Sequence, residues 1–90
     1  MRSIDKDYTK KVFGKNVKKY RLNNCYSQER LCELTDSSLS YISDLERGVV
    51  GASFDKIASF CNVFDIELEQ LFDEAILEER LPDRITEYQK

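Results

Sequence analysis

The spacing of apolar residues along the chain predicts helices and gives no convincing strand. Phe13, Val17 and Tyr20 stand at positions i, i+4 and i+7, which lie on one face of a helix, so residues 8–23 are expected to form the first helix. A turn follows at residues 23–26. Leu31 and Leu34 then predict a short second helix.

Polar residues mark the ends of the predicted helices. Serines stand where N-caps are expected before the second, third and fourth helices: Ser27, Ser38 and Ser53. Asp36, in the turn at residues 35–37, is of a residue type that tolerates a left-handed backbone. Gly48 is expected to end the third helix and Asp65 the fourth.

The third predicted helix is short. In the stretch SLSYISDLERG, Leu39, Ile42 and Leu45 fall three apart on one stripe, with polar residues elsewhere. A helix of about ten residues with so small an apolar face is not stable alone. It is either an ordinary part of a small bundle or an element that inserts into a partner.

Two further helices complete the predicted fold. The fourth is expected to turn five apolar residues toward the core: Phe54, Ile57, Phe60, Cys61 and Phe64. The fifth is expected from Glu67 to about Arg80, where apolar residues recur at helical spacing, and Pro82 ends it. Five helices joined by short turns predict a compact all-α domain.

Composition narrows the class of protein. Ninety residues make one domain. No apolar run approaches the ~20 residues that span a bilayer, and the N-terminus lacks the apolar segment of a signal peptide, so a cytoplasmic protein is expected, with no membrane contact. The three cysteines include no C-x-x-C pair and histidine is absent, so neither a metal nor a cofactor is expected. No nucleotide-binding or nucleophile motif is present, and an enzyme is not expected.

Charge is distributed unevenly, although the net charge is only −3. Residues 1–34 contain nine lysines and arginines against four acidic residues, whereas residues 65–90 contain three against nine. A basic front and an acidic end suggest two surfaces with different partners. Solvated helix faces at the two ends are the alternative explanation.

Several motifs carry a resemblance to a known family. Gln28-Glu29-x-Leu31, followed after a turn by YISDLERG, resembles the helix-turn-helix of the Cro/C1-type (XRE) DNA-binding family. FGKNVKKYR at residues 13–21 resembles its first helix, and SFDKIASFCNVFDIELEQLF at residues 53–72 resembles its closing pattern. The resemblance covers residues 8–72 and implies a compact five-helix lambda-repressor-like domain. Residues 1–7 are then an N-terminal arm, and residues 73–90 an acidic C-terminal helical extension and candidate dimerisation element.

The compact size and acidic tail also resemble the small controller proteins of restriction–modification systems. In the wider family, the third helix enters the major groove of DNA with its N-terminal residues at base edges. The positions that this implies for base reading are Ser38, Leu39, Ser40, Ser43 and Asp44. Leu39 either contacts a thymine methyl or extends the apolar stripe. Asp44 either accepts from a cytosine amino group or lowers the affinity for other DNA sequences.

The helix lacks Arg, Gln or Asn at its start, so direct readout is expected to be weak and DNA shape to matter more. The resemblance also implies positions that contact DNA phosphates: Ser27, Gln28, Tyr41, Arg47, Lys18 and Lys56. The alternatives are a generic first helical residue for Gln28, a partly buried ring for Tyr41, and a solvated surface charge for each lysine. Residues 49–51 are Val, Val and Gly, where the family commonly has basic residues.

Two structural sets are implied as well. Arg21 is expected to pair with Glu46, which would fix the third helix and leave Arg47 free; a plain surface charge is the alternative for Arg21. Cys32 stands where the family usually has alanine, at the crossing of the two motif helices. A dimer interface is expected at Leu71, Phe72, Ile76, Leu77 and Leu81, although Leu71 and Phe72 alternatively close the monomer core.

The sequence therefore predicts a sequence-specific transcription regulator that binds a palindromic operator as a homodimer through the helix at residues 38–47. The expected partners are double-stranded DNA, a second copy of the chain and RNA polymerase, which the bound protein would block or contact. The alternative is a protein-interaction module of the antitoxin or anti-regulator type. Such a module would keep the helix-turn-helix scaffold and use the acidic tail against a basic protein.

Overall fold

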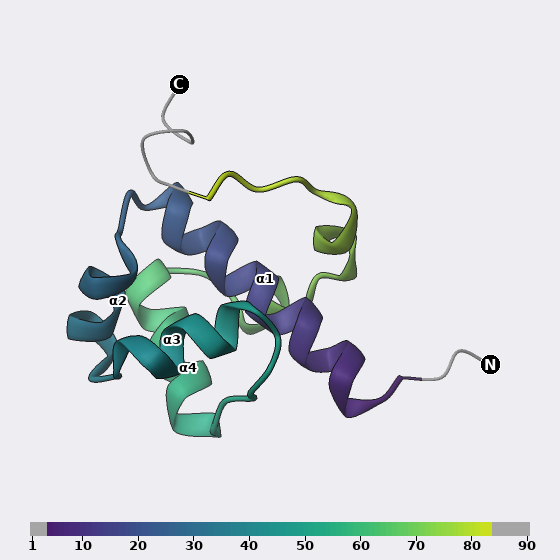
Figure 1. The fold of residues 1–90 in the computed structure, drawn as a ribbon, viewed down its shortest axis with the longest axis horizontal. Helices are drawn as coiled ribbons and strands as arrows, with labels where there is room; N and C mark the ends of the chain where they lie inside the picture. The colour runs from purple at the N-terminus through teal and green to yellow at the C-terminus, as the bar shows by residue number, and fades with distance from the viewer. Residues whose placement is uncertain (1–3, 84–90) are drawn as a thin grey trace.

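The computed structural model describes residues 4–83, and every regular element in that range is helical. The elements are α1 (Lys6–Asn23), α2 (Gln28–Thr35), α3 (Leu39–Glu46), α4 (Phe54–Phe64) and two 3₁₀ helices, η1 (Leu68–Phe72) and η2 (Glu74–Glu78). α1 runs diagonally through the molecule, with α2, α3 and α4 on one side of it and the two 3₁₀ helices on the other (Figure 1).

Side-chain caps fix where the helices begin. The serine hydroxyls expected as N-caps accept hydrogen bonds from backbone amides two or three residues into each helix: Ser27 from Arg30, Ser38 from Tyr41 and Ser53 from Lys56, at 3.0, 3.1 and 3.2 Å. Asp5 caps α1 in the same way, at 2.8 Å from the amide of Tyr8. The first helix therefore begins at Lys6, so the last two residues of the predicted N-terminal arm belong to α1.

Residues with positive φ end three of the helical segments, as predicted. Asp36 and Asp65 stand in the left-handed region at φ 51° and 55°, directly after α2 and α4. Gly48 has φ 78° and follows α3. These are positions where a residue tolerant of left-handed backbone stops a helix and turns the chain.

The core lies between α1 and the other helices. One cluster of buried residues in contact is drawn from α1, α2, α3, α4 and η1: Phe13, Val17, Leu31, Ile42, Leu45, Phe60, Phe64 and Leu71. Phe54, which was expected in this core, is 89% exposed. It is the first residue of α4, and its Cα–Cβ bond tilts toward the N-terminal end of that helix, beyond the packed turns.

The predicted fifth helix is wrong: η1 and η2 replace it, and the chain between them is extended at Asp73. Asn16, buried in α1, supplies the reason. Its side-chain amide nitrogen lies 3.1 Å from the carbonyl oxygen of Leu71 and 3.0 Å from that of Asp73. These carbonyl groups bond to α1 instead of continuing a helical ladder, and the Asp73 carboxylate starts η2 by accepting from the amide of Ala75.

The residues expected at a dimer interface divide into two groups. Leu71 and Ile76 are fully buried within the chain, so they close its own core and offer no surface to a second copy. Phe72 and Leu77 are partly exposed, and Leu81 is half-buried. The predicted interface is therefore reduced to its exposed members.

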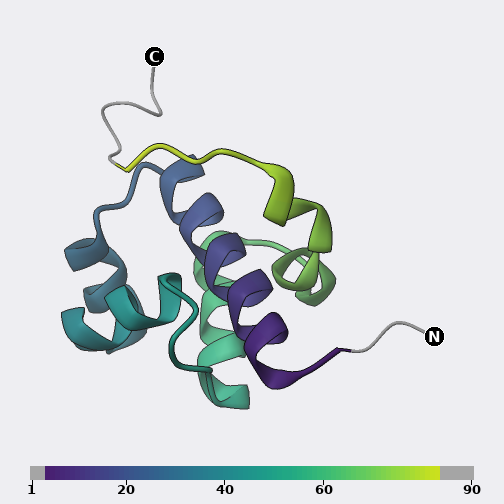
Figure 2. The same cartoon turned by 45° about the vertical axis from the view of Figure 1, so that its right-hand side comes forward.

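After η2 the chain is not helical and returns along α1 toward the C-terminal end of that helix (Figure 2). Glu79 contacts two lysines of α1: its carboxylate lies 3.1 Å from the ammonium of Lys19, and its carbonyl accepts a hydrogen bond from Lys15. Asp83 lies 3.7 Å from Lys18. The expected helical extension is thus an acidic strap as far as residue 83, and its remainder lies outside the described residues.

Within residues 4–83, no helix is both long enough and apolar enough to cross a membrane.

Gly14 allows α1 and α3 to touch. A Cβ atom at this position would stand 2.0 Å from the carbonyl oxygen of Leu45, a distance that only a backbone shift would relieve. At Gly51, by contrast, the nearest atom to an added Cβ is 3.8 Å away. We expect Gly14→Ala to lower the free energy of unfolding by about 1–3 kcal/mol through overpacking, despite the better helix propensity of alanine.

Urea denaturation followed by circular dichroism measures the effect, with Gly51→Ala as the matched control. The control is expected to unfold within about 0.5 kcal/mol of the wild type. Equal stability of the Gly14 variant and the wild type would mean that α1 and α3 are not in backbone contact.

Candidate nucleic-acid interface

A buried ion pair joins α1 to the end of α3. The guanidinium of Arg21 meets the carboxylate of Glu46 through two contacts, Nε to Oε2 at 2.7 Å and Nη2 to Oε1 at 3.0 Å. The two side chains are only 5% and 4% exposed. This is the pair that the family resemblance implied, and its planar two-point geometry fixes orientation as well as distance.

The same pair positions the start of α2. Gln28, the first residue of α2, donates from its amide nitrogen to Oε1 of Glu46 at 3.1 Å. Arg21 also donates through Nη1 to the carbonyl of Tyr26, at 3.0 Å, in the turn before α2. Three helices therefore meet at one charged cluster, and the N-terminus of α2 has a fixed position relative to α3.

Lys56 holds the turn between α2 and α3. Its ammonium lies 2.6 Å and 2.8 Å from the carbonyl oxygens of Thr35 and Asp36, and 2.8 Å from the hydroxyl oxygen of Ser37. An ammonium has three donors, and all three are engaged here. The structure thus gives Lys56 an internal role in the helix-turn-helix in place of the expected phosphate contact.

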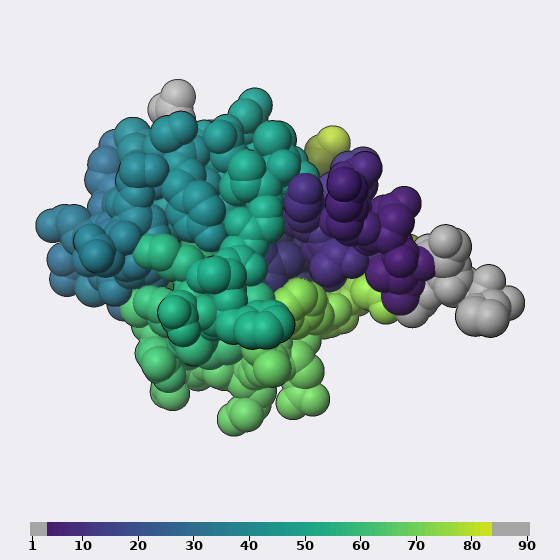
Figure 3. Space-filling view, turned by 90° about the horizontal axis from the view of Figure 1, so that it is seen from below, coloured from purple at the N-terminus to yellow at the C-terminus, as the bar shows by residue number. Residues whose placement is uncertain are grey.

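The outer face of α3 is open at its N-terminal end. Ser38, Leu39 and Ser40 are exposed, whereas Ile42 and Leu45 on the opposite face are fully buried. Leu39 is 46% exposed, which favours contact with a partner over the alternative that it extends the apolar stripe. Figure 3 shows α2, α3 and the loop after α3 as one continuous surface beside the N-terminal turns of α1.

The remaining α3 positions have partners of their own. Arg47, expected to be free, is 2.6 Å from the carboxylate of Asp44, one helical turn earlier. This pair is exposed, and such pairs contribute less than about 1 kcal/mol, so a phosphate can displace the carboxylate at little cost. Ser43 is half-buried, and its backbone carbonyl accepts from the amide of Arg47 at 3.2 Å.

The hydroxyl of Tyr41 donates to the carbonyl of Gly51 at 3.3 Å, so the only proton that it could give a phosphate already has an acceptor. Partial burial raises the pKa of this phenol above its usual range. The ring packs against the core, which agrees with the structural alternative considered for this residue. Lys18 likewise faces Asp83 of the strap and is not an unpaired cation.

Two of the three cysteines, Cys32 and Cys61, are partly buried. Cys32 and Cys61 are free thiols, and residues 4–83 contain no group of three potential metal ligands. Burial raises the pKa of the Cys32 thiol and of the Cys61 thiol. Thiols with raised pKa values are poor nucleophiles near neutral pH.

Sequence reasoning missed Asn16 and Gly14, although each carries a recognisable signal. Asn16 is a polar residue next to Val17 on the apolar stripe, and a buried amide must find partners. Gly14 lies in the middle of a predicted helix, where glycine often marks a close backbone approach. The role of Lys56 has no such signal, because its partners lie about twenty residues away in sequence.

The sequence matches the helix-turn-helix family over residues 17–71. It is also 35% identical over 63 residues to the control protein C.BamHI of Bacillus amyloliquefaciens, an alignment that covers 69% of this chain and 78% of that protein. The matched region includes α2, α3 and the turn that Lys56 holds.

The buried pair allows a sharp test of how α3 is held. Glu46→Leu leaves Arg21 buried without its partner, so we expect the free energy of unfolding to fall by about 3–5 kcal/mol. In the double variant Arg21→Met/Glu46→Leu no charge is left unpaired, and most of that loss should be regained. Urea denaturation of the two single variants, the double variant and the wild type gives the coupling. Additive effects of the two substitutions would contradict a direct interaction.

Proposed function

The chain belongs to the Cro/C1-type (XRE) helix-turn-helix family and is a DNA-binding transcription regulator, and from this we propose that it binds a palindromic operator as a homodimer, with α3 in the major groove. The observation that carries the proposal is the exposed N-terminal end of α3, a helix whose C-terminal end is fixed to α1 by Arg21 and Glu46. The relative from Bacillus amyloliquefaciens is itself named a control protein, which supports a regulatory role.

Base contacts are assigned to the exposed start of α3. Ser38 and Ser40 carry hydroxyls that donate or accept, and Leu39 presents an apolar surface that fits a thymine methyl group. Ser43 and Asp44 follow one turn later. When Arg47 binds a phosphate instead of Asp44, the carboxylate of Asp44 can accept from a cytosine amino group. Hydroxyls discriminate bases weakly, so sequence-dependent DNA shape contributes to the specificity.

Phosphate contacts are assigned to the start of α2 and the end of α3. The first amides of α2 have no intrahelical partner, and Ser27 and Gln28 stand at this N-terminus, which favours an anion. At the other end, Arg47 exchanges the carboxylate of Asp44 for a phosphate. The regulatory effect then follows from occupancy, by blocking RNA polymerase or by contacting it next to the operator.

Homodimerisation is supported by apolar surface on the 3₁₀ helices. Leu68, Phe72 and Leu77 are 59%, 37% and 39% exposed, although they lie within ten residues of one another in sequence. Two-fold pairing through this surface would place two α3 helices roughly 34–36 Å apart, one turn of DNA. The alternative of an acidic tail that binds a basic protein is less favoured, because Glu79 and Asp83 already face lysines of α1.

We expect selection of bound sites from random duplexes to return a palindrome with half-sites one turn apart. On the selected duplex, Arg47→Ala should lower the affinity. It should also reduce the slope of log Kd against log salt concentration by about one unit. Asp44→Asn frees Arg47, so it should raise affinity for all duplexes while weakening site preference. Fluorescence anisotropy at several salt concentrations measures both. Binding without salt dependence, or without any preferred site, would refute the proposed function.

We expect the wild type to sediment as a dimer and Leu68→Glu/Leu77→Glu as a monomer, because both substitutions place charge in the proposed interface. Phe54→Glu is the matched control: it changes a residue that is even more exposed but lies at the start of α4, and it should remain dimeric. Analytical ultracentrifugation distinguishes the three. A monomeric wild type would contradict the homodimer, and a monomeric Phe54 variant would move the interface to α4.

A further inference from the structure

Most cationic side chains in the described residues 4–83 are already engaged by the protein itself. Seven form ion pairs or hydrogen bonds: Lys15, Lys18, Lys19, Arg21, Arg30, Arg47 and Lys56. Four have no such partner in the part of the chain that the structure describes: Lys6, Lys10, Lys11 and Arg80. Three of these four occur within six residues, in the first turns of α1.

This lysine group, defined as Lys6, Lys10 and Lys11, lies against the loop that follows α3. The Cα and Cγ atoms of Lys11 are 3.1 Å from the place that a Cβ on Gly48 would occupy. The Cε atom of Lys10 is 3.8 Å from the corresponding point at Gly51. Figure 3 shows the N-terminal turns of α1 directly beside this loop on one face of the molecule.

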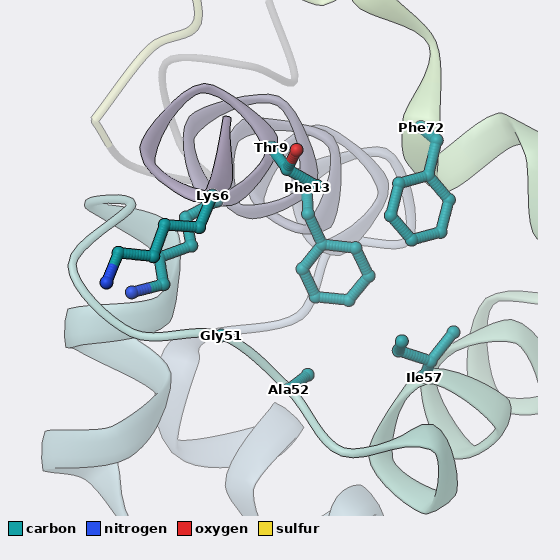
Figure 4. Close-up of a pocket in the computed structure, with 8 residues that line it drawn as sticks. Lys6, Thr9, Phe13, Gly51, Ala52, Ile57 and Phe72 are labelled. Carbon is teal, nitrogen blue, oxygen red and sulfur yellow. The ribbon is translucent and has the colours of Figure 1, made fainter. Parts of the chain in front are cut away.

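The lysine side chains point away from the apolar interior. Lys6 and Lys10 line the rim of a cavity of about 260 Å³ whose other walls include Phe13, Ile57 and Phe72. In Figure 4 the side chain of Lys6 extends away from the rings of Phe13 and Phe72. Lys6 and Lys11 are exposed and Lys10 is half-buried, so the group lies at the surface beside the loop.

The loop itself offers no positive charge. Between Arg47 and Lys56 the only charged residue is Asp55, and Lys56 is turned inward onto the helix-turn-helix. The acidic groups at this end of α1 are Asp5, whose carboxylate caps α1, Asp7, and Glu74, which accepts from the hydroxyl of Tyr8. Lys10 and Lys11, which lie beside Gly51 and Gly48, therefore supply the positive charge next to the loop.

We propose that the lysine group is a second phosphate-binding site, which contacts the DNA backbone at the edge of the major groove beside the C-terminal end of α3. This site rests on the proposed function. The N-terminus of α2 and the lysine group both adjoin the C-terminal end of α3: Gln28 donates to Glu46, and Lys11 lies beside Gly48. The lysine group would then add backbone contacts next to those assigned to Ser27, Gln28 and Arg47.

The chemistry fits a positioning contact. Lysine is a flexible point charge that binds a phosphate without demanding a fixed geometry. Such contacts set register and affinity but do not read bases. Removing them is therefore expected to weaken binding equally on preferred and unrelated duplexes, in contrast to changes on the outer face of α3.

The test compares the salt dependence of DNA binding by the full-length wild type and Lys10→Gln/Lys11→Gln, on the selected duplex and on a mixed-sequence duplex. Each phosphate contact contributes a slope of about 0.9 in log Kd against log salt, so the double variant should lose about two units. The difference in affinity between variant and wild type should then shrink about tenfold from 50 to 200 mM salt. The preference between the two duplexes should not change.

Two matched variants separate a local contact from net charge. Lys15→Gln/Lys19→Gln removes the same charge from the same helix, but these ammonium groups already bind Glu79, so the slope should change by less than half a unit. Lys10→Arg/Lys11→Arg keeps the charge and should behave as wild type.

An unchanged slope in Lys10→Gln/Lys11→Gln, with wild-type DNA binding intact, overturns the lysine site alone. An equal loss in both Gln variants also overturns it, because net charge would then explain the effect. A wild type with no salt-dependent binding refutes the proposed function, and the site falls with it.

Discussion

The pair between Arg21 and Glu46 is the constraint on which the functional surface depends. A buried ion pair adds little stability compared with a well-packed apolar replacement, because both ions lose their hydration. What it provides here is geometry: two parallel contacts orient the last turn of α3, and Gln28 ties the start of α2 to the same carboxylate. An eight-residue helix cannot hold itself straight and in place in water. Its direction is therefore imposed from α1.

Two further contacts restrict the motions that the ion pair leaves open. Gly14 brings the backbone of α1 against that of α3, so α3 cannot move toward α1 without a clash. Lys56 of α4 bonds to the turn before α3, so the N-terminal end of α3 cannot move away from α4. The exposed end of α3 is thus a rigid edge, and binding DNA requires little ordering of the protein. That preorganisation favours affinity even though the serines themselves contact bases weakly.

The sequence predicts those features of the fold that depend on neighbours along the chain. The serine caps, the left-handed aspartates and the helical stripes each need only a few adjacent residues, and the structure contains them. The fifth helix fails because Asn16, about 55 residues earlier in the chain, takes the carbonyl groups that would have continued it. The phosphate contacts predicted for two lysines are wrong for the same reason. Whether a lysine is available for DNA depends on which acid or carbonyl folds against it, and neither helical spacing nor family resemblance carries that information for Lys18 or Lys56.

The division of cations also explains how a chain of net charge −3 presents a positive surface. The acidic strap lies against the C-terminal half of α1, where Glu79 raises the pKa of Lys19 through a hydrogen bond. Lys10 is nine positions earlier, about 13 Å along the helix axis. The Debye length at physiological salt is about 8 Å, so the field of the strap is largely screened at that distance. The two ends of α1 therefore behave as separate electrostatic surfaces, one neutralised by the chain itself and one directed toward the loop after α3.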